Sequence, residues 1–273
     1  MIVSGPSYGQ NMKLSSGDLI RVLLILVGGT AINIWGLNWI PLHKLPLSPF
    51  WATIFFRACS SALSLLLIRI FCPAALPKFG WGHKPKQLLI ALGIVLFLMG
   101  SALFRIDYRH TGFTDITMSF IFALFIGIDE DFFSRGFIYG SLERYGMWFA
   151  AIVSSVHFGL LHLGNIIWGG QSAAYTIAQV VSAGSFGFLA AALMVFSGSI
   201  WVPILMHGLC DFPMQFESGV QYTKMVTGGA DWIAVGFDVF IYSLIGWLLL
   251  TISSQKSPKI LLRLGLIDSP EAK

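Results

Sequence analysis

The sequence predicts an all-α membrane protein, a polytopic bundle of about eight transmembrane helices with both termini in the cytoplasm. Of the 273 residues, 56% are hydrophobic and only 11% are charged, whereas soluble domains carry about 25% charged residues. The mean hydropathy of +0.77 indicates the same class. Several apolar stretches approach the ~20 residues that a helix needs to span a bilayer. Residues 1–273 are therefore predicted to form a single membrane domain.

Eight apolar segments are the expected spans, and the third, fifth and seventh are the shortest. In chain order they cover residues 19–40, 50–72, 88–104, 117–141, 147–163, 173–197, 199–216 and 232–253. With this topology, eleven of the seventeen Lys and Arg lie on the cytoplasmic side and four lie outside. Because cytoplasmic loops of membrane proteins carry an excess of Lys and Arg, both ends are placed inside. Residues 254–273 then form a cytoplasmic tail, and a bacterial inner membrane is the expected location.

Four charged residues interrupt the fourth apolar segment: Asp129, Glu130, Asp131 and Arg135. One charged side chain near the bilayer centre costs about 2.5–3.5 kcal/mol on insertion scales, so such a group is expected to serve a function. Asp131 and Arg135 are four residues apart, share a helix face and are expected to form an ion pair. Glu130 lies about 100° around the helix and has no such partner there, which suits a general base or acid. The alternative is a buried network that only fixes helix packing.

Histidines follow in the fifth and seventh segments. His157 and His162 are five residues apart, roughly 140° around a helix, so only one of them is expected to face a shared site. His207 and Asp211 are four apart and can hydrogen-bond or point at one ligand, although Asp211 can instead cap its helix. At about 1.5 Å of rise per residue, Glu130 can lie at the same depth as His162 and His207.

In chain order, these motifs resemble those of the CPBP family (CAAX proteases and bacteriocin-processing enzymes), whose shared region is also called the Abi domain. The family includes the type II CAAX prenyl endopeptidases and carries EExxxR, FxxxH and HxxxN or HxxxD on successive membrane helices. Here the motifs are Glu130-Asp131-x-x-x-Arg135, Phe158-x-x-x-His162 and His207-x-x-x-Asp211. The resemblance covers about residues 117–216, the predicted catalytic core. Asp131 departs from the usual Glu, and Asp129 falls outside the motif.

The resemblance implies a role for each motif residue. Glu130 activates a water for attack on a peptide carbonyl, and His162 helps to hold that water. His207 and Asp211 stabilise the developing oxyanion or orient the site. Asp131 and Arg135 support the other residues.

The motif residues are compatible with either a metal-free or a zinc-dependent site. Two imidazoles and a carboxylate, here His162, His207 and Glu130, also make a catalytic zinc set. Members of the family are often called metalloproteases, while a metal-free glutamate mechanism is also argued. Because the histidines lie on separate segments and no HExxH is present, we favour a metal-free site slightly over zinc.

The predicted function is that of a membrane-embedded endopeptidase, a CAAX-protease-like hydrolase acting on a lipidated or membrane-associated peptide or protein. Membrane lipids are the other expected partners, and no nucleic acid is expected. The alternative is a non-proteolytic scaffold or self-immunity protein that binds a peptide or a sensor kinase, and a proton-coupled transporter is a third, less favoured hypothesis. Arg57 is the charged residue in the interior of the second segment. It could contact substrate or an acid of the site, but pairing or snorkelling is the favoured role. His157 is a candidate alternate site residue, but the Phe158–His162 spacing favours His162.

Overall fold

The computed structural model describes residues 15–35, 46–80, 84–106, 111–167, 170–214 and 229–254. Within these ranges the chain is helical and contains no β-strand, so the predicted all-α class is confirmed. Most of the predicted cytoplasmic tail, from residue 255 on, lies outside the described residues, as do residues 1–14. The placement of both termini in the cytoplasm stays a prediction.

Helices occupy each of the eight expected segments. Their bounds are α1 Ser16–Leu23, α2 Gly29–Trp35, α3 Pro49–Phe71, α4 Pro85–Met99, α5 Phe113–Asp131, α6 Tyr139–Leu142, α7 Met147–Leu161, α8 Gly164–Ile167, α9 Ala173–Ser197, α10 Trp201–Met214 and α11 Gly229–Ser253. A π-helical turn, Leu24–Gly28, joins α1 to α2, and a second one, Phe132–Ile138, joins α5 to α6.

Five helical stretches in the described part of the chain are long and apolar enough to cross a bilayer. They are Ser16–Asn33, Pro49–Phe71, Met147–Ile166, Ala173–Ser197 and Trp232–Ser253, and α4 is a shorter apolar helix. Large apolar side chains also cover the outside, where Phe97 of α4 is 83% exposed and Ile233 of α11 is 75% exposed. Such an outer surface is suited to lipid, where exposed apolar groups lose nothing. The chain is therefore a multi-pass membrane protein, while the count of eight spans stays a prediction.

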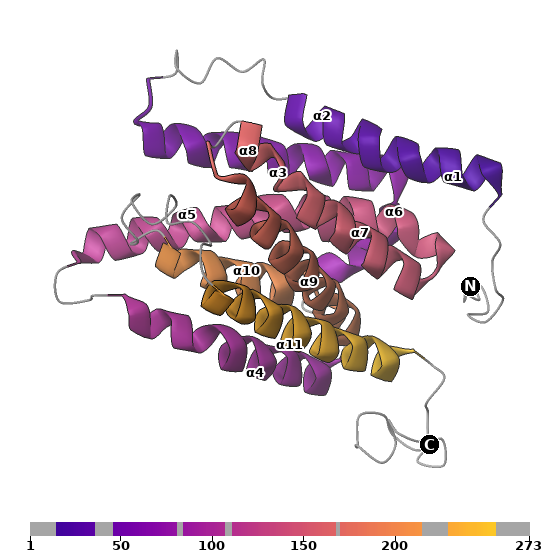
Figure 1. Cartoon of the computed structure of the whole chain (residues 1–273). Coiled ribbons are helices and arrows are strands. Elements are labelled where there is room, and N and C mark those ends of the chain that lie inside the picture. The colour runs from indigo at the N-terminus through magenta and orange to yellow at the C-terminus, as the bar shows by residue number, and fades with distance from the viewer. Residues whose placement is uncertain are drawn as a thin grey trace.

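The helices form a layered bundle with α5 and α10 near its middle (Figure 1). Helix α5 packs against α10 and α3, and α9 packs against α7 and α11. Two glycines permit a close approach of one helix backbone to another. A Cβ on Gly127 of α5 would lie 2.9 Å from the carbonyl oxygen of Ile204, and one on Gly159 of α7 would lie 2.6 Å from that of Val180. These contacts bring α5 close to α10 and α7 close to α9.

The π-helical turn Phe132–Ile138 carries Arg135 into the protein interior, and all seven of its residues are buried. Such turns are rare and occur frequently at functional sites. Gly136 within this turn and Gly140 just after it lie against other side chains with no room for a Cβ. A Cβ on Gly136 would lie 2.6 Å from Ile68 Cδ1, and one on Gly140 would lie 2.8 Å from Ala75 Cβ. These two glycines, four residues apart, thus allow the segment to pack closely against α3 and against the 3-10 turn Pro73–Phe79 that follows α3.

Candidate active site

A cavity of about 560 Å³ lies among α2, α3, α5, α7, α9 and α10. Its lining contains the four residues that were predicted to be catalytic, which come from three different helices or their ends. The charged and histidine side chains that line it are Arg57, Asp129, Glu130, His162, His207 and Asp211. The structure therefore brings the three sequence motifs to one place.

Asp131 and Arg135 form the predicted pair, buried beside His207. Arg135 Nη1 lies 3.1 Å from Asp131 Oδ1, and the two side chains are 1% and 0% exposed. The contact is a close ion pair without hydrogen-bond alignment, since neither atom has a hydrogen-bond partner in the described part of the chain. The guanidinium also lies over the ring of Phe158, 4.2 Å from its centroid. This cation–π contact links the first motif to the second.

Helix α9 makes room for that contact through a glycine. A Cβ on Gly187 would lie 3.0 Å from Arg135 Nη2 and 3.2 Å from Phe158 Cδ1. A larger residue here would push the guanidinium off the ring. Gly187 belongs to no sequence motif, so only the packing of α9 against α7 reveals its part in the site.

His207 lies between three carboxylates. Its Nδ1 is 3.2 Å from Asp131 Oδ2, within hydrogen-bonding distance. Its Nε2 is 3.6 Å from Glu130 Oε2 and 3.6 Å from Asp211 Oδ2. The hydrogen bond to Asp131 orients the ring, because a proton on Nδ1 is donated to that carboxylate. The other nitrogen then points to where Glu130 and Asp211 meet.

Aromatic rings hold the imidazole of His207 from the sides. The rings of Phe158 and Phe186 approach it edge to face, with centroids at 5.9 Å and 5.4 Å. His207 is only 6% exposed. The ring is therefore fixed by packing as well as by its hydrogen bond.

Glu130 is the most accessible of these acids, with a side chain that is 32% exposed. The sequence offered it no partner on its own helix, and the structure supplies one from α3: Arg57 Nη1 lies 3.7 Å from Glu130 Oε1. The same guanidinium donates a hydrogen bond of 3.2 Å to Asp129 Oδ2. Arg57 is thus paired, as predicted, and its partners are acids of the site, which the sequence had offered only as the less favoured alternative.

His157 on α7 and His162 at the C-terminal end of α7 face different surroundings, as their spacing predicted. His162 lines the cavity, and its Nδ1 donates a 3.0 Å hydrogen bond to the carbonyl of Phe158. Its Nε2 is then an acceptor for a proton from a bound water. His157 is absent from the described lining and instead shares a 2.7 Å hydrogen bond with Thr30 of α2. His157 therefore serves the packing of α2 against α7.

Side-chain amides also line the cavity, and no sequence motif contains them. Asn165 Nδ2 donates to Gln179 Oε1 at 2.9 Å, and the backbone N–H of Gln171 donates to the carbonyl of Asn165 at 3.1 Å. Amides can both donate to and accept from a peptide backbone. The only available signal in the sequence was their polarity beside apolar segments.

The residues do not fit a preassembled metal site. No group of three or more His, Cys, Asp or Glu side chains has metal-binding geometry among the residues the structure describes. The predicted zinc set of His162, His207 and Glu130 does not form such a group, and a role for zinc stays a prediction.

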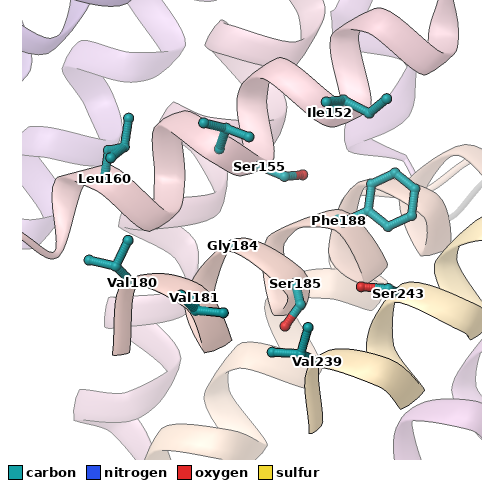
Figure 2. Close-up of a pocket in the computed structure, with 11 residues that line it drawn as sticks. Ile152, Ser155, Leu160, Val180, Val181, Gly184, Ser185, Phe188, Val239 and Ser243 are labelled. Atoms are coloured by element: carbon teal, nitrogen blue, oxygen red, sulfur yellow. The ribbon is translucent and has the colours of Figure 1, made fainter. Parts of the chain in front are cut away.

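A second cavity, of about 370 Å³, lies between α7, α9 and α11. Figure 2 shows its apolar lining with hydroxyls from Ser155, Ser185 and Ser243. Its lining contains no ionisable residue. The acid–base groups lie in the lining of the first cavity, and we define that one as the candidate active site.

Comparison with protein families confirms the resemblance that the motifs suggested. Residues 112–213 match the family model described as type II CAAX prenyl endopeptidase Rce1-like. The matched segment includes all four predicted catalytic residues, and it excludes α3 with Arg57. A search of curated proteins found no match.

Proposed function

We propose that this chain, whose residues 112–213 match the Rce1-like type II CAAX prenyl endopeptidase family, is an intramembrane endopeptidase in which Glu130 activates water. The family supports a membrane protease in general. The finer proposal rests on one observation: Glu130 and Asp211 each approach His207 Nε2 to 3.6 Å within a cavity of a membrane bundle.

The proposed reaction begins with a water held between Glu130 and His162. Glu130 removes a proton from the water as its oxygen bonds to the carbonyl carbon of the substrate. The carbonyl oxygen becomes an oxyanion, and the peptide C–N bond then breaks. The leaving nitrogen takes the proton from Glu130, which restores the carboxylate and balances the reaction.

His207 is the proposed donor to the oxyanion. In its imidazolium form it donates from Nδ1 to Asp131, 3.2 Å away, and has Nε2–H available for the developing charge. A preorganised donor of this kind typically accelerates acyl transfer about 10²–10³-fold. Asp211, 3.6 Å from Nε2, stabilises the imidazolium, and Arg135 holds Asp131 in place through their ion pair.

The proposed substrate is a lipidated or membrane-associated peptide or protein, and membrane lipids are the other partners. A peptide chain suits the cavity, since Asn165, Gln171 and Gln179 offer hydrogen bonds to its backbone. We place the protein in a bacterial inner membrane with both termini in the cytoplasm, in keeping with the distribution of Lys and Arg.

The test is cleavage of prenylated and plain membrane peptides by the purified protein in nanodiscs. Glu130→Gln is expected to lower kcat by about 10²–10⁴-fold, the usual contribution of a general base, while the protein stays folded. Asp115→Asn is the matched control, because Asp115 is an exposed acid at the start of the same helix, α5. Wild-type protein without activity on any of these peptides, or Glu130→Gln with full activity, would contradict the proposal.

Metal analysis of the same sample separates the two cofactor hypotheses. A metal-free site predicts substoichiometric zinc and cleavage that a chelator does not inhibit. Stoichiometric zinc with chelator-sensitive cleavage would replace the water-activating role of Glu130 by that of a metal ligand.

A further inference from the structure

One arginine that approaches the proposed general base comes from outside the matched segment. Arg57 lies on α3, lines the cavity, and is 23% exposed. We infer that Arg57 is a positioning residue: anchored by Asp129, it fixes the Glu130 carboxylate in the orientation that faces His207. The inference rests on the proposed function, since it concerns the geometry of the proposed base.

Asp129 and an aromatic ring fix the guanidinium. Arg57 Nη1 donates to Asp129 Oδ2 at 3.2 Å, and the Asp129 side chain is only 12% exposed. The guanidinium carbon also lies 5.9 Å from the centroid of the Phe122 ring. Because a guanidinium is planar and rigid, these two contacts limit both its position and its tilt. Asp129, the acid that falls outside the family motif, thereby gains a role as the anchor.

The two oxygens of Glu130 face different partners. Oε1 is 3.7 Å from Arg57 Nη1, and Oε2 is 3.6 Å from His207 Nε2. The carboxylate therefore bridges α3 and α10 and cannot swing toward either helix without losing the other contact. A glutamate that is 32% exposed would otherwise sample several rotamers, and Arg57 restricts them.

The packing of α3 holds Arg57 in register with the acids. Helix α3 packs against α5 and against the π-helical turn that follows it. The face that follows Arg57 along α3 buries small residues, Ser60, Ser61 and Ser64. Ser61 Oγ donates to the carbonyl of Arg57 at 2.8 Å. Small side chains allow a close approach of the helices, which brings the arginine within reach of α5.

The expected effect follows from the sensitivity of catalysis to geometry. A misplacement of about 1 Å can cost about 10²-fold in rate. Arg57→Gln is expected to lower kcat by about 10–100-fold with KM changed less than about threefold, because the substrate is still bound. Arg57→Lys is expected to retain more activity, and added guanidinium ion at low millimolar concentration is expected to restore part of kcat in Arg57→Gln. The matched control is Arg69→Gln, an exposed arginine on the same helix, with unchanged kcat.

A measurement without substrate tests the contact itself. Thermal unfolding of Arg57→Gln, Glu130→Gln and the double variant is expected to be non-additive, whereas Arg57→Gln combined with Asp115→Asn is expected to be additive. Full kcat in Arg57→Gln overturns the inference, as does a loss that neither lysine nor guanidinium relieves. Inactive wild-type protein refutes the proposed function, and the double-mutant cycle then still decides whether Arg57 fixes the Glu130 carboxylate: coupling supports that contact and additivity overturns it.

Discussion

Removal of the Arg135 charge is the sharpest test of how this fold tolerates its acids. The substitution Arg135→Gln leaves Asp131 without its ion-pair partner at a position where the two side chains are 1% and 0% exposed. Breaking a buried ion pair on one side costs about 3–5 kcal/mol, and here the buried Asp131 carboxylate would keep only its hydrogen bond with His207. The lost cation–π contact with Phe158 is part of the same change.

The assay is thermal unfolding in detergent, followed by circular dichroism. A loss of about 3–5 kcal/mol corresponds to a fall of roughly 6–20 °C in Tm, taking about 2–4 °C per kcal/mol for a protein of this size. The double variant Asp131→Asn/Arg135→Gln removes both charges, and the amide oxygen of the new asparagine keeps an acceptor for His207. This double variant is therefore expected to lose less stability than Arg135→Gln alone.

The control is again Arg69→Gln, since an exposed substitution usually changes stability by no more than about 0.5 kcal/mol. A Tm of Arg135→Gln that matches the control would refute the argument. So would a double variant that is no more stable than the single one, because the penalty would then not arise from the unpaired Asp131 charge.

Two further comparisons use matched positions. His162→Gln is expected to lower kcat by at least about 10²-fold. His157→Gln loses a hydrogen bond to α2, so it is expected to lower Tm while kcat stays within about threefold of wild type. Equal kcat values for the two variants would contradict the assignment of His162 to the site. Gly127→Ala places a Cβ 2.9 Å from a backbone carbonyl of α10 and is expected to cost about 1–3 kcal/mol by overpacking. At Gly93 of α4 an added Cβ meets nothing within 4 Å, so Gly93→Ala is expected to be neutral or stabilising. A Tm for Gly127→Ala equal to that of Gly93→Ala would show that α5 and α10 are not so tightly packed.

The sequence alone determined the features that depend on composition and on helical periodicity. A chain that is only 11% charged has few alternatives to a membrane bundle, because so much apolar surface needs lipid around it. Residues four apart share a helix face wherever that helix lies in the fold. For this reason, spacing alone was enough to pair Asp131 with Arg135 and His207 with Asp211.

Only the tertiary structure shows which residues of different helices contact one another. Periodicity gives the rotation of a residue about its own helix axis, and rise gives its depth, but neither says which helix lies opposite. Nothing in the sequence therefore joined Asp131 to His207 Nδ1 at 3.2 Å, or Arg57 to Asp129 at 3.2 Å. Those distances exist because glycines and serines let α3, α5 and α10 approach closely, which is a property of the packed bundle and of no single segment.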